Sequence, residues 1–398
     1  MVTLFLQEEE SKILPESKDT FEIFDLIHKN HREKFSLTHD FFSHNYKIQS
    51  SGYVGIINLD KNYSLQIKPK TSISNIFRML EYAYNLKSFE FLEGIVSVDS
   101  IEEIFERLAA ILAKLVLDRN RKGLYRGYIQ RTQSLPHLRG RVEVKPSVIS
   151  LLRGSIHPTC SFEENTSDLE ENEILLWTLC KLHQFDIKRD ETKRVVRMAF
   201  RELTNKVSLV QFHSQDCINR FYNKLNIDYK PMHGICRFVL EHTGPTLEQG
   251  NHDFLPFILY MPGLFESFIA EWLKEKLPRK YRLKIQYHTV LDSDRRIEFK
   301  IDLVIINTDT NSACCVLDTK YKKNLESSTQ DIAQVVAYAT EMQTEQAFLI
   351  YPSKEIGDSN IKVGPNIQVN SLQFDLNEDL EKSGELFLNS LLNKITNN

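Results

Sequence analysis

The 398-residue sequence lacks the signatures of several common functional classes. Its six cysteines form no CxxC pair and no paired Cys/His spacing, which argues against a zinc site and favours reduced, structural thiols. There is no GxxxxGK[ST] segment, so we expect that the chain itself binds no nucleotide. The histidines form no HxH or HExxH pattern, and no GxSxG elbow indicates serine hydrolysis.

Long apolar runs and a strong charge imbalance are also missing. The best apolar run, LAAILAKLVL, is short and contains Lys114, and MVTLFLQEEE lacks the basic and apolar regions of a signal peptide. We therefore expect a cytoplasmic protein that does not insert into a membrane. The formal net charge of −4 gives no overall signal for nucleic-acid binding, so any DNA-binding surface must be local.

The patterned segments predict two regions. The length and the 41% hydrophobic content suit ordinary buried cores. Residues 53–68 predict two strands joined by a turn, and apolar residues at helical spacing dominate residues 73–230. Gly and Pro cluster at residues 244–256, where we place a boundary. We predict a mainly helical N-terminal region with a small β element near residues 50–70, over 1–245, and a second domain over 246–398.

The second domain shows the order of an α/β core. A helix is predicted over 261–277, and strands are predicted within 282–291, 295–306 and 313–322. A helix over 329–342 and an apolar run at 347–351 follow. We therefore predict a central mixed sheet flanked by helices.

Three charged residues fall inside the predicted strands. Asp318 and Lys320 share one strand face, and a turn centred near residue 309 or 310 sets Asp302 opposite either Val316 or Asp318. Either register brings the two carboxylates within about 5 to 8 Å at Cβ. Such a pair suits Mg²⁺ or Mn²⁺, and an adjacent ammonium suits phosphate chemistry. The alternative is an edge strand whose outer face carries solvated charges.

These charged residues belong to a larger polar set in the second domain. The set comprises Glu266, Asp302, Asp318, Thr319, Lys320, Gln334 and Tyr338. It resembles the PD-(D/E)xK nuclease superfamily in its RecB-like branch, although Ile301 replaces the proline of that motif. The resemblance implies that Asp302, Asp318 and the Thr319 carbonyl bind a metal ion, and that the other residues assist catalysis around Lys320.

A longer series of segments is similar, in order, to the McrC family. The segments, within residues 50–345, are YVGIINLDKNYSLQIKPK, IFRMLEYAYNL, LPHLRGRVEV, FEENTSDLEENEILLWTL, LFESFIAEWL, VLDTKYKKN and DIAQVVAYA. McrC is the nuclease subunit of modification-dependent McrBC restriction systems, which serve antiviral defence. The resemblance implies an Mg²⁺-dependent endodeoxyribonuclease that works with, and stimulates, an McrB-like AAA+ GTPase ring. The ring recognises double-stranded DNA carrying modified cytosine and engages the N-terminal part of McrC, so we expect residues 1–245 to bind the partner.

Basic residues gather in two places. One set is expected to contact the partner and comprises Arg119, Arg121, Arg126, Arg139 and Arg141. A second set is expected to contact the DNA backbone near the proposed site and comprises Arg282, Lys284, Arg295, Arg296 and Lys322. Solvated surface residues are the alternative for both sets. The alternative function is a non-catalytic adaptor that activates a nucleotide-driven ring and binds DNA through a nuclease-like fold.

Overall fold

A computed structural model describes residues 2–40, 43–60, 62–84, 86, 101–185, 187–242, 257–290, 298–322, 328–353, 360–364 and 366–396. The chain forms two compact units, one made of Met1–Ile104 with Pro256–Asn398 and the other of Phe105–Leu255. This division differs from the sequential one at residue 245, because the first unit joins the two ends of the chain. None of the described helices is both long enough and apolar enough to cross a membrane.

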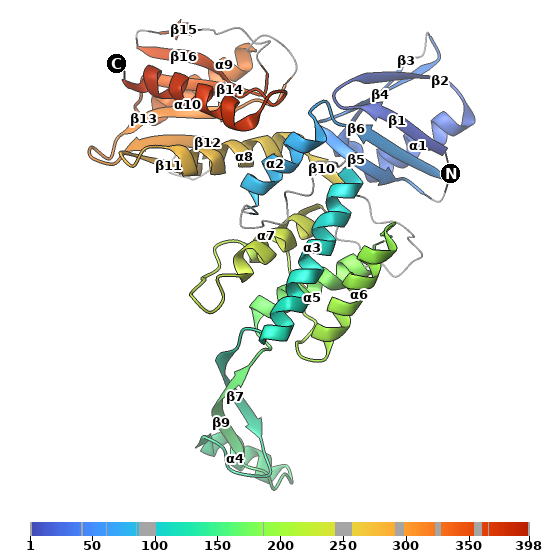
Figure 1. Ribbon diagram of the computed structural model, residues 1–398, viewed down its shortest axis with the longest axis vertical. Helices are drawn as coiled ribbons and strands as arrows, with labels where there is room; N and C mark the ends of the chain where they lie inside the picture. The colour runs from blue at the N-terminus through green and yellow to red at the C-terminus, as the bar shows by residue number, and fades with distance from the viewer. Residues whose placement is uncertain are drawn as a thin grey trace. The chain divides into compact units, whose positions relative to one another are not determined.

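A six-stranded mixed sheet forms the C-terminal part of the first unit (Figure 1). Its strands, in spatial order, are β11 (Tyr281–Val290), β12 (Glu298–Asn307), β13 (Ala313–Thr319), β14 (Gln346–Tyr351), β16 (Ile367–Gln373) and β15 (Asn360–Val363). The hairpins are antiparallel, whereas β13, β14 and β16 run parallel to one another. The predicted α/β core with a mixed sheet is confirmed. Strands β15 and β16 and the helix that follows them were not predicted.

Three helices pack on this sheet. They are α8 (Met261–Lys276), α9 (Thr329–Glu341) and α10 (Leu380–Thr396). Helix α9 lies against β13, β14 and β16 and buries Val335 and Ala339, as its apolar spacing predicts. Trp272 of α8 is fully buried and packs edge-on against Phe387 of α10. Gly384 allows this approach, because a Cβ at that position would collide with the indole.

The N-terminal part of the first unit contains far more β structure than we predicted. One sheet has the order β1 (Val2–Gln7), β6 (Tyr63–Lys68), β5 (Tyr53–Asn58) and β10 (Phe257–Tyr260), and a second has β2 (Ser11–Pro15), β4 (Asn45–Ser50) and β3 (Phe35–Asp40). Only the β5–β6 hairpin matches the predicted element near residues 50–70. Strands β1 and β10 were missed because β1 pairs with β6 and β10 with β5 across long sequence separations, which local patterns do not reveal. The local β3–β4 hairpin was not predicted either. Helices α1 (Lys18–Asn30) and α2 (Ile73–Ala83) complete this part.

The second unit combines helices with a β-sheet arm (Figure 1). Its helices are α3 (Ile101–Lys122, whose first turn lies in the other unit), α5 (Glu170–His183), α6 (Asp190–Thr204) and α7 (Tyr229–His242). The arm consists of β7 (Gly127–Ser134), β9 (Thr159–Thr166), β8 (Arg141–Val142) and α4 (Val144–Leu152). The predicted helical character of residues 73–230 is therefore correct for α3, α5 and α6 and wrong for the strands of the arm, while α7 lies almost entirely after that range.

Candidate active site

The β12–β13 hairpin sets two carboxylates side by side. Leu303 pairs with Leu317, so the next position along each strand sets Asp302 beside Asp318. This is one of the two predicted registers. The Thr319 backbone N–H and hydroxyl donate to Asp302 Oδ2 at 2.9 and 3.0 Å, which fixes the Asp302 side chain at the end of β13. The hairpin thus supports the shared face predicted from strand alternation rather than a solvated edge.

Asp318 is buried, with 1% of its surface exposed. Burial, followed by the nearby Asp302 charge, raises the pKa of Asp318 to about 6. Its Oδ2 atom lies 2.7 Å from Lys320 Nζ in an ion pair, and a carboxylate oxygen can accept more than one such contact. An oxygen in this state retains acceptor capacity for a cation.

Lys320 lies at the centre of a polar chain. Its Nζ donates to Gln334 Oε1 at 3.0 Å and lies 3.7 Å from Asp331 Oδ1, in addition to its ion pair with Asp318. Burial alone would lower the pKa of Lys320, but the surrounding carboxylates, Asp318 foremost, outweigh it and raise the pKa. Lys320 therefore remains an ammonium at neutral pH.

Helix α9 supplies the next members of this chain. Gln334 Nε2 donates to the Tyr338 hydroxyl at 2.8 Å, as their i, i+4 spacing allows. The Tyr338 ring packs edge-on against Phe299 at 5.2 Å between ring centroids. The two amide atoms of Gln334 therefore join Lys320 to an anchored tyrosine, and the structure brings all three predicted residues together.

Asp331 is a site residue that the sequence reasoning missed. It forms a capping box with Ser328 at the start of α9 and pairs with Lys322 Nζ at 2.8 Å. Its pKa is lowered: burial acts in the opposite direction, but hydrogen bonds from Lys322 and Ser328 outweigh it. The Ser-x-x-Asp spacing signals a helix start, which is how Asp331 could have been found. Lys322, predicted to contact DNA, is held by this carboxylate.

Glu266 of α8 lies on the Asp302 side of the site. Burial, followed by the Asp302 charge, raises the pKa of Glu266, and Gln286 Nε2 donates to Glu266 Oε1 at 3.2 Å. Gln286 has a positive φ of 47°, which is uncommon for a residue other than glycine within a strand. The strand pattern around Gln286 gave no signal for this contact.

The oxygen donors of the site fit a hard divalent cation. Asp302 and Asp318 provide two adjacent carboxylates, and Asp318 Oδ2 has acceptor capacity left. Among the described residues, no group of three or more His, Cys, Asp or Glu side chains is arranged to hold a metal ion. Magnesium often retains several waters and needs only one or two carboxylates, so this pair matches Mg²⁺ better than a zinc-type cage.

The predicted DNA-contacting residues have different surroundings. Arg282 is exposed and its Nη2 donates to Asn311 at 3.1 Å, while Lys284 Nζ lies 4.6 Å from the centroid of the Tyr287 ring. These two residues share one side of β11. Arg295 and Arg296 lie outside the described residues.

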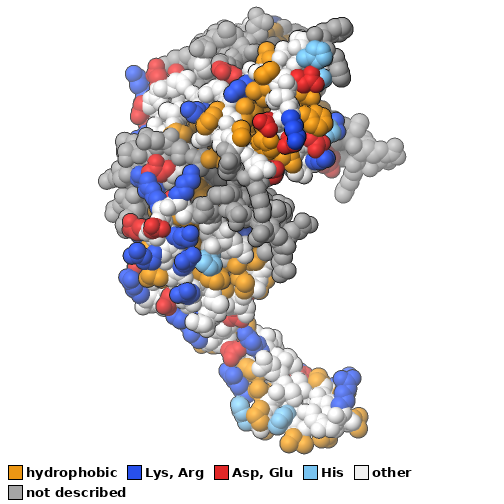
Figure 2. Space-filling model, turned by 90° about the vertical axis from the view of Figure 1, so that its right-hand side faces the viewer, with side chains coloured by type: hydrophobic (Ala, Val, Ile, Leu, Met, Phe, Trp, Pro, Cys, Tyr) orange, Lys and Arg blue, Asp and Glu red, His pale blue; other side chains and the backbone are white. Residues whose placement is uncertain are grey.

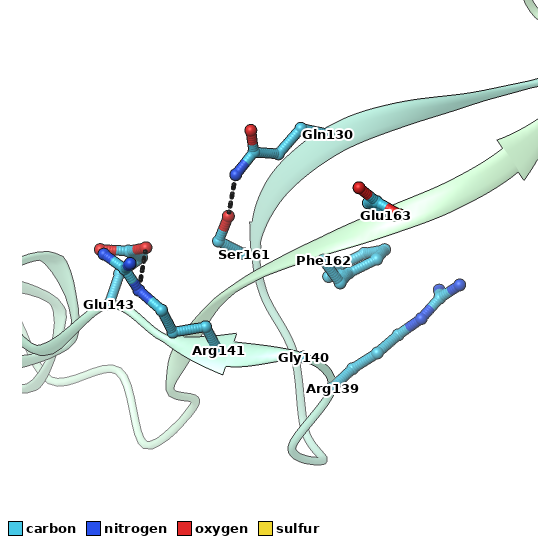
Figure 3. A pocket seen from close by; sticks show the side chains of 8 residues that line it. All are labelled: Gln130, Arg139, Gly140, Arg141, Glu143, Ser161, Phe162 and Glu163. Carbon is cyan, nitrogen blue, oxygen red and sulfur yellow. Dashed lines mark hydrogen bonds and ion pairs between the residues drawn. The ribbon is translucent and has the colours of Figure 1, made fainter.

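The arm of the second unit carries a separate polar pocket of about 480 Å³ (Figure 3). Arg139 stacks over the Phe162 ring at 4.0 Å, and Arg141 Nε pairs with Glu143 Oε1 at 3.3 Å. Gly140 between them has a φ of 66°, and a Cβ there would collide with the Ser161 carbonyl. Glycine is therefore required where the arm holds these two arginines.

The other three predicted partner-binding arginines lie outside this pocket. Arg119 donates to the Leu225 carbonyl at 3.0 Å, and Arg126 Nε donates to Asn165 Oδ1 at 2.6 Å. Arg121 pairs with Asp118 on the same helix at 3.2 Å. The five arginines are thus divided between the body of the second unit and its arm, and the pocket contains only Arg139 and Arg141 of the set.

Helix α4 at the tip of the arm has no buried residue. Its apolar side chains and those just after it are strongly exposed, including Val144 at 68%, Leu151 at 63%, Leu152 at 83% and Ile156 at 83%. Figure 2 shows hydrophobic side chains gathered at this tip. Sequence reasoning missed this surface, because an apolar helix normally indicates a core element.

The sheets and helices place the chain in the mixed α/β class. A family model described as a McrBC 5-methylcytosine restriction system component matches residues 48–352. The chain belongs to this family, which confirms the predicted resemblance to a component of McrBC restriction systems.

Two individual comparisons agree with this family. The chain is 23% identical over 311 residues to the type IV methyl-directed restriction enzyme EcoKMcrBC of Escherichia coli (strain K12), covering 72% of this chain and 87% of that protein. It shares its fold with a chain from a half-complex of Thermococcus gammatolerans McrB AAA+ hexamers with bound McrC, at a TM-score of 0.59 and 17% identity, covering 98% of this chain and all of that one.

Proposed function

We propose that this chain is the DNA endonuclease subunit of a McrBC-type restriction system and uses Mg²⁺, or Mn²⁺, to hydrolyse phosphodiester bonds. The observation that carries the proposal is the arrangement at the end of β13. Two adjacent carboxylates lie beside a protonated lysine, which helix α9 holds through Gln334. This arrangement matches the PD-(D/E)xK chemistry that the sequence resemblance implies.

The proposed role of each site residue follows from its charge and its pKa. Asp302, Asp318 and the Thr319 carbonyl would hold the cation, whose chemistry is to polarise a phosphoryl oxygen and to lower the pKa of a coordinated water. Lys320 remains protonated, so it offsets negative charge on the phosphate and does not act as the base. Glu266 has a raised pKa and is therefore a stronger base than an ordinary glutamate.

The partner is proposed to be an McrB-type AAA+ GTPase ring that recognises double-stranded DNA carrying modified cytosine. Family membership and the shared fold with a chain from the McrB–McrC assembly support this proposal. We assign the contact with the ring to the arm of the second unit. Its exposed apolar tip and its arginine pocket lie on one projecting element (Figure 1). Such a surface gains stability when a partner covers it.

The proposal is tested with the chain assembled with an McrB-type GTPase and methylated double-stranded DNA. Asp318→Asn should abolish cleavage while stimulation of GTP hydrolysis stays at the wild-type level, because the change is confined to the end of β13. Asp309→Asn, an exposed aspartate at the turn of the same hairpin, is the matched control and should cleave normally. Unchanged cleavage by Asp318→Asn would leave only the adaptor role.

A further inference from the structure

Tyr321 directly follows the lysine of the proposed centre and lies at the middle of a tight turn. The Lys320 N–H donates to the Ile350 carbonyl at 2.8 Å, and the Lys322 N–H donates to the Lys320 carbonyl at 3.0 Å. Both lysine side chains point to the Asp331 carboxylate, at 3.7 and 2.8 Å. The position of Tyr321 therefore influences the backbone conformation of Lys320 and Lys322, and with it the positions of both ammonium groups.

The Tyr321 side chain packs against the N-terminal sheet of the same unit. Only 6% of Tyr321 is exposed. Lys70 Nζ lies over its ring at 4.0 Å, its hydroxyl lies 3.4 Å from Thr71 Oγ1, and its ring lies 5.8 Å from that of Phe265. Lys70 and Thr71 directly follow β6, whereas Phe265 precedes Glu266 on α8. One ring thus contacts both the N-terminal sheet and the helix that carries Glu266.

Glu8 places a buried carboxyl beside this tyrosine. Only 1% of Glu8 is exposed, and its Oε2 accepts the Lys70 N–H at 2.9 Å. Its Oε1 has no well-directed hydrogen bond among the described residues, although the Glu8 and Tyr321 side chains influence each other electrostatically. The phenolic hydroxyl of Tyr321 is a hydrogen-bond donor at neutral pH. A buried acceptor without a donor is costly, which favours this pairing.

We propose that Tyr321 is a positioning residue for Lys320, held in place by Glu8, Lys70 and Thr71 at the ends of β1 and β6. The N-terminal sheet thereby sets where the ammonium of the proposed centre lies. This inference rests on the proposed nuclease function. It assigns a role in that reaction to Glu8, Lys70 and Thr71, which are not among the residues that resemble the PD-(D/E)xK motif.

The test compares Tyr321→Phe and Glu8→Gln with wild type in the assembled complex, on methylated DNA. Tyr321→Phe retains the ring and loses the hydroxyl. We expect kcat for cleavage to fall about ten-fold, since a misplacement on the order of 1 Å can cost about 100-fold. Glu8→Gln should lower kcat by about three-fold, while KM for DNA and GTPase stimulation stay within about two-fold for both variants. A general loss of folding would change all three quantities together.

Tyr63→Phe is the matched control, because the Tyr63 hydroxyl also donates to carboxylates, Asp19 at 2.7 Å and Glu22 at 2.9 Å, within the same unit but without contact to Tyr321. It should leave kcat unchanged. Lys320→Ala separates the two proposals. If Lys320→Ala abolishes cleavage while Tyr321→Phe and Glu8→Gln both cleave at the wild-type rate, the positioning role is wrong and the nuclease function stands. Full cleavage by Lys320→Ala overturns both. Should Tyr321→Phe fail to fold, Glu8→Gln decides.

Discussion

The end of β13 and the tip of the β7–β9 arm distribute charge and apolar surface in opposite ways. At the first, carboxylates and an ammonium are withdrawn from water and joined in a chain of contacts from Asp318 to Tyr338. At the second, apolar side chains that would normally form a core are exposed on α4. Both arrangements cost stability in isolation. Such costs are typical of functional sites, and the difference indicates chemistry at one place and contact with a partner at the other.

The largest effect is expected from removing Lys320, which lies at the centre of the polar chain of contacts from Asp318 to Tyr338. Lys320→Ala should lower the single-turnover cleavage rate by about 100- to 1,000-fold, because it removes the ammonium group that offsets charge on the phosphate. Lys362→Ala, an exposed lysine on strand β15 of the same sheet, is the control and should cleave normally. A loss of similar size in both variants would contradict the special role of Lys320.

The arm is tested by adding charge to its exposed apolar tip. Leu152→Glu should reduce partner binding and GTPase stimulation by more than about ten-fold, because the buried core of a protein interface is depleted of charge. The fold should survive, since Leu152 is 83% exposed. Leu225→Glu provides a matched control at a 69% exposed leucine outside the arm. Normal stimulation by Leu152→Glu would remove the arm from the proposed interface.

A milder effect is expected from removing the last hydrogen bond of this polar chain, at Tyr338. Tyr338→Phe removes the hydroxyl that accepts from Gln334 but keeps the ring against Phe299. We expect cleavage to fall by roughly three- to ten-fold, since Lys320 keeps its ion pair with Asp318 while Gln334 loses its anchor. The rate is measured at saturating Mg²⁺ and DNA. An effect as large as that of Lys320→Ala would assign Tyr338 a direct part in the reaction.

The smallest effect concerns pH and thermal stability without added metal. The pKa of Asp318 is raised in the folded chain to about 6 from an ordinary 3.8, so the folded state binds its proton more tightly. This group therefore makes the fold less stable as pH rises from about 4 to about 6. Asp318→Asn should lack that component, which is measured as the difference in Tm between variant and wild type across this pH range. A constant difference would show that Asp318 has an ordinary pKa.

The sequence predicted the charged site better than its surroundings. Strand alternation and a short turn were enough to bring Asp302 and Asp318 together, and helical spacing was enough to align Gln334 with Tyr338. Both inferences depend on short-range geometry. Asp331 was overlooked because its carboxylate serves at once as a helix cap and as the partner of Lys322.

Features that depend on distant pairing were not predictable in the same way. Strand β1 pairs in parallel with β6, and β10 pairs with β5 from the other end of the chain, so no local pattern indicated the N-terminal sheet or the contacts of Lys70 and Thr71 with Tyr321. The strands of the arm were not predicted, because β7 and β8 pair with β9 across the inserted helix α4. The contact between Gln286 and Glu266 was also not predictable, because Gln286 has a positive φ and a glutamine in a strand pattern gives no sign of that conformation.

The most direct test of the central claim is to measure Mn²⁺ binding to the isolated chain by electron paramagnetic resonance at pH 8. Wild type and Asp309→Asn should bind one ion with equal affinity, whereas Asp302→Asn and Asp318→Asn should each weaken binding by more than about ten-fold, because each removes one of the two anionic ligands. Equal binding by all four proteins would contradict a divalent cation held between Asp302 and Asp318.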